Sequence, residues 1–184
     1  MSSPVAQSAL LARVEQFERA ARASAATVER VPRSAEAIAQ AVQRLEPKAG
    51  RIAVAAALDL PDELFEACRR LPGAFPGRSK QELESADLGI TDAFAGVART
   101  GTVCVSVDHG HAGYISLLSR AHVAVLDAAH IVERPSDVVS PPWLDGQGLR
   151  RNFVFITGPS ATADMGPLVR GVHGPHRLHV LIVV

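Results

Sequence analysis

The sequence is poor in the groups that build metal and redox centres. Its 184 residues include only two cysteines, Cys68 and Cys104, which lie far apart in the chain. They supply neither a C-x-x-C redox motif nor a four-cysteine iron or zinc site. No G-x-G-x-x-G or Walker motif is present, so nucleotide binding of those two types has no direct support. We therefore predict no cofactor and no metal site in this chain, and any iron–sulfur chemistry would belong to a partner.

Net charge and long apolar runs are missing as well. The 19 Lys and Arg residues balance the 19 Asp and Glu residues, so no large field draws the chain onto nucleic acid or an anionic membrane. No apolar run approaches the roughly 18–20 residues that span a bilayer, and the first residues lack the basic stretch and apolar block of a signal peptide. We predict a cytoplasmic protein that binds neither nucleic acid nor membrane.

Aromatic residues are scarce, at 4% of the chain, whereas hydrophobic residues make up 47%. The core must therefore consist mainly of Ala, Val, Leu and Ile, which is typical of a sheet covered by helices. The length suits one domain. We expect a single domain over residues 1–184, with an N-terminal helical segment over residues 1–48 and a sheet-containing core over residues 50–184.

Two amphipathic helices are predicted in the N-terminal segment. In residues 8–30, apolar side chains recur at helical steps of three and four residues. These side chains are Leu10, Val14, Phe17 and Ala21. Pro32 interrupts the pattern, and Ser34 is placed to cap a second helix that ends near Pro47 and Gly50.

Strands alternate with helical connections in the rest of the chain. Buried strands are predicted at residues 52–58, 102–107, 123–126, 153–157 and 178–184. Residues 61–70 are predicted to be helical because Pro61 fits a first helical turn, and Asp92 is placed to cap a short helix over residues 93–98. The proline-rich residues 135–151 predict a loop. This order predicts an α/β fold with a mostly parallel, doubly wound sheet.

Thr100-Gly101-Thr102 is the first candidate ligand segment. Gly101 would let the backbone approach a ligand closely, and the hydroxyls of Thr100 and Thr102 can bind carboxylate or phosphate oxygens. A tight turn between a helix and a strand explains the same three residues equally simply. Both interpretations stay open.

Gly158-Pro159-Ser160 is the second candidate, followed by Thr162 and Asp164. We expect it to leave the carboxyl end of a strand and enter a helix, where ligands gather and free N–H groups attract anions. Ser160 or Thr162 would also serve as a helix cap, with Asp164 favourable to the helix dipole. Capping alone accounts for every polar residue here.

His173 is the third candidate. It is followed by His176 and His179 at steps of three, as in some zinc sites, but Gly174-Pro175 would interrupt a continuous helix. We therefore predict no metal there. His173 suits a ligand-facing donor or proton carrier, since imidazole titrates near neutral pH.

Six short segments together resemble the lactate-utilisation domain family, and within it the protein C branch. In chain order they are Gly89-Ile90-Thr91, residues 98–102, Ser116-Leu117-Leu118, Gly158-Pro159-Ser160, Thr162-Ala163-Asp164 and Val172-His173-Gly174-Pro175. Their order and spacing match over about residues 50–184. The resemblance implies a fold like that of glucosamine-6-phosphate deaminase, ribose-5-phosphate isomerase and coenzyme A transferases. It also implies a role beside an iron–sulfur partner in the oxidation of L-lactate to pyruvate.

Two positions depart from the family pattern. Arg99 stands where the family usually carries Glu, and Gly166 stands where an acidic residue is usual. Both departures remove acidic groups, which favours anion binding over acid–base chemistry. We expect an anion-receptive surface of ten residues: Arg99, Thr100, Gly101, Thr102, Gly158, Pro159, Ser160, Thr162, Asp164 and His173.

Three functions remain open from the sequence, and it does not decide whether the chain is an enzyme. The leading hypothesis is an accessory or ligand-binding subunit of an iron–sulfur L-lactate oxidation system, which binds a small carboxylate or organises its partner. An independent enzyme acting on a sugar phosphate or acyl thioester would need Asp92, Asp164 or His173 as its base. A structural or regulatory protein would act through its N-terminal helices.

Overall fold

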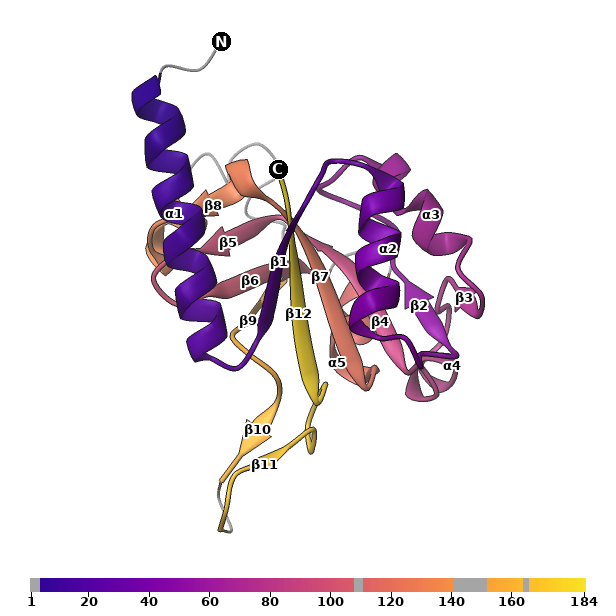
Figure 1. Cartoon of the computed structure of the whole chain (residues 1–184). Coiled ribbons are helices and arrows are strands. Elements are labelled where there is room, and N and C mark those ends of the chain that lie inside the picture. Colours follow the sequence, from indigo (N-terminus) through magenta and orange to yellow (C-terminus); the bar gives the residue numbers. More distant parts are fainter. Residues whose placement is uncertain (1–3, 108–110, 141–151, 164–165) are drawn as a thin grey trace.

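The structure, a computed structural model, describes residues 4–107, 111–140, 152–163 and 166–184 (Figure 1). Its larger sheet has six parallel strands in the order β1-β12-β7-β4-β2-β3. These strands are β1 (Thr27–Val31), β12 (Arg177–Val183), β7 (Ala121–Asp127), β4 (Leu88–Ala93), β2 (Ile52–Val54) and β3 (Ala74–Phe75). Every residue of β4 and β7 is buried, as a parallel sheet covered on both faces requires. The predicted α/β class with a mostly parallel sheet is confirmed.

A smaller, mixed sheet has four strands in the order β8-β5-β6-β9. They are β8 (Ile131–Val132), β5 (Ala95–Val97), β6 (Thr102–Ser106) and β9 (Phe153–Ile156), and β6 runs antiparallel to both of its neighbours. A hairpin of β10 (Ala161–Thr162) and β11 (Val169–Arg170) projects from the body of the molecule (Figure 1). β9 is a strand as predicted, but it is not buried, because it forms the edge of the small sheet.

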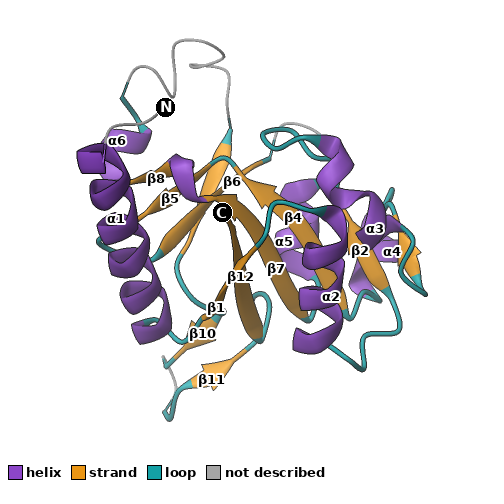
Figure 2. Cartoon of the chain, turned by 45° about the horizontal axis from the view of Figure 1, so that its top comes forward, coloured by secondary structure: helices purple, strands orange, loops and turns teal. Residues whose placement is uncertain are grey.

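Helices cover both faces of the main sheet (Figures 1 and 2). They are α1 (Pro4–Ala23), α2 (Ala35–Leu45), α3 (Glu66–Arg69), α4 (Lys80–Glu84), α5 (Ala112–Leu118) and α6 (Pro135–Val138), with 3₁₀ turns η1 (Asp62–Phe65) and η2 (Ala128–His130). One core cluster joins α1 and α5 to the sheet through Phe17 and Ile115. The other joins α2 and η1 through Ile38 and Phe65. The two clusters are the two sides of a doubly wound sheet.

The N-terminal segment contains a strand that the sequence pattern did not predict. The helix expected over residues 8–30 ends at Ala23, and Ala25 takes a left-handed φ of 65°. Thr27–Val31 then pairs in parallel with β12, with Val28 and Val31 buried. Thr and Val side chains are stiff at χ1 and favour strands, so helical spacing in this stretch was misleading. The predicted cap of α2 is confirmed, since Ser34 Oγ accepts a hydrogen bond from the Ala37 N–H at 3.1 Å.

The short helix predicted over residues 93–98 is wrong. Strand β4 continues to Ala93, and β5 follows directly and pairs with β6. Asp92 caps no helix: its Oδ2 accepts the backbone N–H groups of three loop residues at 2.6–3.2 Å. These residues are Leu58, Asp59 and Leu60. The burial of residues 93–98 and the pairing of β5 with β6 and β8 override the capping signal.

Other predicted elements differ mainly in length. The strand expected over residues 52–58 is limited to β2, and the helix expected over residues 61–70 consists of η1 and α3. The predicted loop over residues 135–151 begins with α6, and residues 141–151 lie outside the described residues. Among the helices of the described residues, none is long and apolar enough to cross a membrane.

The packing of α1 gives a first prediction. Phe17 is fully buried, and its ring lies against Gly96 and the small sheet. Phe17→Ala is expected to lower the free energy of unfolding by about 3–5 kcal/mol, the usual cost of removing a buried aromatic ring. Leu11, on the same helix, is 48% exposed, so Leu11→Ala should stay within about 0.5 kcal/mol. Urea unfolding measures both. Equal, small effects would mean that α1 is not packed on its own chain but available to a partner.

Candidate functional site

Thr100-Gly101-Thr102 forms the turn between β5 and β6, not a turn between a helix and a strand. Gly101 has a φ of 65°, and a Cβ there would lie 2.1 Å from the backbone nitrogen of Ala21 in α1. The close backbone approach expected at this glycine is therefore made by α1. Gly158 is used in the same way: its φ is 71°, and a Cβ would lie 2.1 Å from the carbonyl oxygen of Ser24. Both glycines let the end of α1 pack tightly.

A chain of threonine hydroxyls links the first two candidate segments. Thr100 Oγ1 lies 2.7 Å from Thr102 Oγ1, which in turn lies 2.7 Å from Thr157 Oγ1. Thr157 immediately precedes Gly158 at the end of β9. The two segments, which are far apart in sequence, are thus brought together through Thr157. Arg99 is exposed beside this turn.

Gly158-Pro159-Ser160 is joined to the segment around His173 by backbone hydrogen bonds. The Ser160 N–H donates to the Pro175 carbonyl, and the Gly171 N–H donates to the Ser160 carbonyl, each at 2.9 Å. The helix predicted after Ser160 is wrong, because the chain enters β10 there. No helix N-terminus is therefore available at Ser160 to bind an anion. Asp164 lies outside the described residues.

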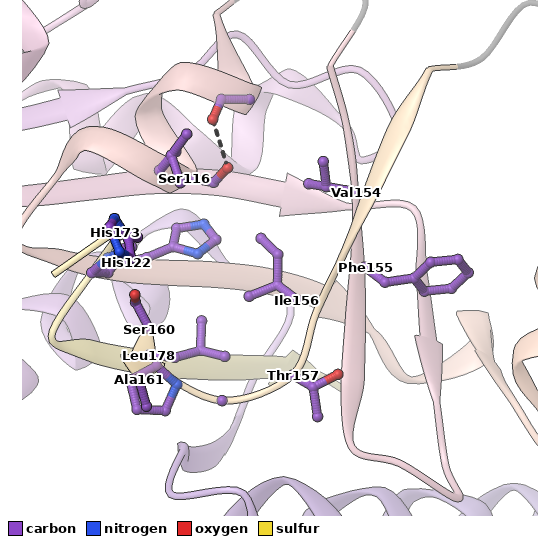
Figure 3. Close-up of a pocket in the computed structure, with 16 residues that line it drawn as sticks. Ser116, His122, Val154, Phe155, Ile156, Thr157, Ser160, Ala161, His173 and Leu178 are labelled. Atoms are coloured by element: carbon purple, nitrogen blue, oxygen red, sulfur yellow. Dashed lines mark hydrogen bonds between the residues drawn. The ribbon is translucent and has the colours of Figure 1, made fainter. Parts of the chain in front are cut away.

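These segments form one wall of a cavity of about 440 Å³ (Figure 3). It is lined by Gly113, Ser116, Leu117, His122, Val154, Phe155, Ile156, Thr157, Gly158, Pro159, Ser160, Ala161, His173, Gly174, Pro175 and Leu178. Four of the ten predicted site residues are among them: Gly158, Pro159, Ser160 and His173. The predicted residues Arg99, Thr100, Gly101, Thr102 and Thr162 are not, although Thr102 reaches the cavity wall through its bond to Thr157.

The cavity lies at the amino ends of the parallel strands, whereas the sequence predicted a ligand site at carboxyl ends. His122 and Leu178 are each the second residue of their strands, β7 and β12. The cause is the orientation of β9, which belongs to the small sheet and runs antiparallel to β6. Its carboxyl end therefore arrives where β7 and β12 begin.

Three polar side chains of the cavity lie across from two apolar side chains of β9, while Leu178 lies beside Ser160 and Thr157 lies on the side of β9 (Figure 3). Figure 3 shows His122, His173 and Ser160 on one side and Val154 and Ile156 of β9 on the other, with the Phe155 ring directed away. Among the described lining residues there is no Arg, Lys, Asp or Glu. The cavity therefore offers hydroxyl and imidazole groups and a hydrocarbon wall to a ligand.

His122 forms part of the inner wall and is fully buried. Its Nε2 lies 2.9 Å from Thr91 Oγ1, and its Nδ1 has no hydrogen-bond partner among the described residues. Burial, together with a smaller effect of the nearby His179, lowers the pKa of His122 to about 3, so the ring is neutral at physiological pH. No sequence motif points to His122. Its only signal was a polar side chain within an otherwise apolar strand.

Gly89 makes room for the inner wall. It is paired with His122 across β4 and β7. A Cβ at Gly89 would lie 2.5 Å from Ser119 Oγ and 2.6 Å from the Ile115 carbonyl oxygen. The glycine thus lets α5 lie directly on the sheet next to His122. The segments around residues 89–91 and 116–118 therefore lie next to the cavity wall that His122 forms.

The candidate bases named from the sequence differ in their access to the cavity. Asp92 is 3% exposed, and burial raises its pKa even though three backbone N–H groups oppose that rise. It does not line the cavity. His173 lines the cavity and is exposed. Among the described residues, no group of three His, Cys, Asp or Glu side chains could hold a metal ion.

The glycines that face α1 give a second prediction. Gly158→Ala should lower the free energy of unfolding by at least about 1–3 kcal/mol, because φ is positive and the new methyl group meets the Ser24 carbonyl. Gly50 is a matched control, since a Cβ there would make only an ordinary contact of 3.6 Å with Asp87. Gly50→Ala should be neutral or slightly stabilising. Thermal unfolding measures the stability of both variants. Equal stability would contradict the close packing of Gly158 against Ser24.

The buried imidazole gives a third prediction. The pKa of His122 is lower in the folded state, about 3, than the ordinary value of 6.5 that applies to the unfolded chain. As the pH falls below about 6.5, the unfolded state takes up a proton that the folded state excludes, so stability falls. This contribution is fully present above that pH and decreases by up to about 1.4 kcal/mol per pH unit below it. Urea unfolding between about pH 5 and 6.5 should show a smaller slope for His122→Gln than for wild type. Identical slopes would refute it.

Comparisons with known proteins agree with the resemblance seen in the sequence. The model of the LUD domain family matches residues 14–183. Lactate utilization protein C of Halalkalibacterium halodurans is 36% identical over 110 residues, which is 58% of this chain and 48% of that protein. The protein of the same name from Shouchella clausii is 35% identical over 109 residues, with the same two shares. The match thus spans about half the length of these relatives.

The fold also has a counterpart of known structure. A DUF162 family protein from Deinococcus radiodurans has a TM-score of 0.71 and 21% sequence identity, covering 95% of this chain and 98% of that one. At this identity the likeness concerns the fold alone. The family model, in contrast, covers nearly all of the chain, including the second half of α1, the two larger sheets and the cavity. The chain belongs to the LUD domain family.

Proposed function

We propose that this chain is an accessory, ligand-binding subunit of a lactate-utilisation system and that its cavity binds a small carboxylate. The observation that carries the proposal is the convergence of Gly158-Pro159-Ser160 and the segment around His173 on one cavity wall. A hydroxyl at Ser160 and an exposed imidazole at His173 can both donate hydrogen bonds to a carboxylate. Arg99, which the sequence favoured as an anion ligand, does not line the cavity, so we give it no part in binding.

The burial of both cysteines supports the placement of the iron–sulfur clusters in a partner protein. Cys68 and Cys104 are both buried, and burial raises the pKa of each thiol to about 12. Metal binding requires the thiolate, so neither residue is prepared to ligate a cluster. We propose that the clusters lie in a separate iron–sulfur lactate-oxidising protein, which this chain assists.

The projecting β10–β11 hairpin supports contact with such a partner. Leu168, Val169 and Val172 are 51–61% exposed on or beside it. Apolar side chains gathered on a projecting element are typical of a contact surface. The hairpin also continues directly from the cavity wall, so a partner bound there would lie next to the ligand.

Carboxylate binding is the fourth prediction. Isothermal titration of the full chain with L-lactate and pyruvate should show binding that Ser160→Ala and His173→Ala each weaken roughly fivefold or more, the cost of one lost hydrogen bond. Thr162→Ala is the matched control, because Thr162 lies in β10 outside the cavity lining. The carboxylate site would be refuted by equal effects of all three variants or by wild-type protein that binds neither acid.

The partner is tested separately. The chain is expected to co-purify with a cysteine-rich iron–sulfur protein from the same cells, and Val169→Glu should abolish this association. Val139→Glu is the control, because Val139 is equally exposed but lies beside α6. A lactate-oxidising iron–sulfur protein that is fully active in cells lacking this chain would overturn the accessory role.

A further inference from the structure

His122 has a polar edge that no described residue satisfies. The imidazole is fully buried, its Nε2 is occupied by Thr91, and its Nδ1 has no partner among the described residues. An unpaired buried polar atom costs free energy. Because His122 lines the cavity, a bound ligand is in a position to supply the missing partner.

The hydrogen bond to Thr91 identifies which tautomer His122 adopts. Thr91 is fully buried, and the structure gives its hydroxyl one side-chain partner within the described residues, Nε2 of His122. If Nε2 accepts the hydroxyl proton, only Nδ1–H is left without a partner. If Nε2 donates instead, the hydroxyl proton and the Nδ1 lone pair are both left unpaired. The first arrangement costs less, so Nδ1 carries the proton and is an uncharged, unpaired donor on a ring that lines the cavity.

The Nδ1–H donor of His122 would be satisfied by an acceptor oxygen on the ligand. A keto oxygen is such a group, since it accepts hydrogen bonds and brings no proton of its own that must be satisfied. His122, Ser160 and His173 lie on the same side of the cavity in Figure 3. A ligand whose carboxylate meets Ser160 and His173 would therefore place an adjacent keto oxygen toward His122.

The volume of the cavity indicates how large the rest of the ligand can be. A cavity of about 440 Å³ is several times larger than a three-carbon acid. The wall opposite the polar side chains consists of Val154 and Ile156, with Leu178 nearby. Burial of hydrocarbon against this wall would add affinity in proportion to the area covered. Pyruvate would leave most of it uncovered.

We propose that the cavity binds a 2-oxo acid with an apolar side chain, whose keto oxygen accepts a hydrogen bond from Nδ1–H of His122. This inference rests on the proposed carboxylate site and names the class of molecule that fills it. His122 is the residue that distinguishes an oxo acid from the corresponding simple acid. The apolar wall distinguishes a longer chain from pyruvate.

Matched ligands test the proposal on the full chain. Titration should show that 4-methyl-2-oxopentanoate binds roughly tenfold tighter than 4-methylpentanoate, which lacks the keto oxygen. It should also bind more tightly than pyruvate. Equal affinity for the two six-carbon acids overturns the inference while leaving the carboxylate site in place. Binding of pyruvate without binding of either six-carbon acid overturns the inference alone, and binding of none of the three acids overturns the proposed function as well.

Two variants of His122 separate a ligand contact from a structural role. His122→Gln places an amide near the Nε2 position and keeps the bond to Thr91, whereas His122→Asn places one near Nδ1 and keeps the group that faces the ligand. The preference for the keto acid should disappear in His122→Gln and persist in His122→Asn. The opposite pattern, or no difference, refutes the proposal.

A spectroscopic measurement covers the case in which a variant does not fold. In wild-type protein labelled with ¹⁵N-histidine, the His122 signals should report the Nδ1–H tautomer, and the keto acid should shift the Nδ1 signal. An Nε2–H tautomer, or an Nδ1 signal that does not respond to saturating keto acid, overturns the inference without recourse to any variant.

Discussion

The parallel pairing of β12 with β7 and β1 determines where the rest of the chain can lie. β12 is the last strand in sequence but lies inside the main sheet, and its seven residues are aligned with all seven of β7. Because the strands are parallel, the segment that precedes β12 must arrive at the edge where β7 begins. That segment contains Ser160 and His173, so the pairing places them over His122 and creates the cavity.

The fold could be predicted from the sequence where one local signal dominated. The continuous apolar runs of β7 and β12 predicted buried strands, and Ser34 predicted the start of α2, because both features act within a few residues. Strands β1 and β5 could not be predicted in this way. The first continues a helical spacing, and the second follows Asp92, which the sequence predicted to cap a helix. What decides both is a distant partner, β12 for the first and β6 for the second, and no local pattern contains that information.

The loop residues of the candidate site could be predicted from the sequence, but the strand residue that lines it could not. Ser160 and His173 lie in short polar, glycine-containing segments, which are typical of the loops that carry binding residues in α/β proteins. Gly101 was expected to let the backbone approach a ligand closely, and Gly158 was included in the predicted ligand surface, yet what approaches the two glycines is α1 and the residue that follows it. His122 gave no sign of its role, because a histidine inside an apolar strand is indistinguishable from an ordinary buried one until its neighbours are known.

The uncharged interior of the cavity depends on how β12 distributes its side chains. Leu178 lines the cavity, while the next residue, His179, points to the opposite face, where its Nε2 lies 2.9 Å from Glu46 at the end of α2. Burial alone would raise the pKa of Glu46, but hydrogen bonds from Arg177 and His179 outweigh it and lower that pKa. A shift of β12 by one residue would exchange the two faces, bringing His179 into the cavity and leaving Glu46 without its bond to that ring. The contacts of Arg177 and His179 with Glu46 are therefore among those that hold only in the observed register of β12.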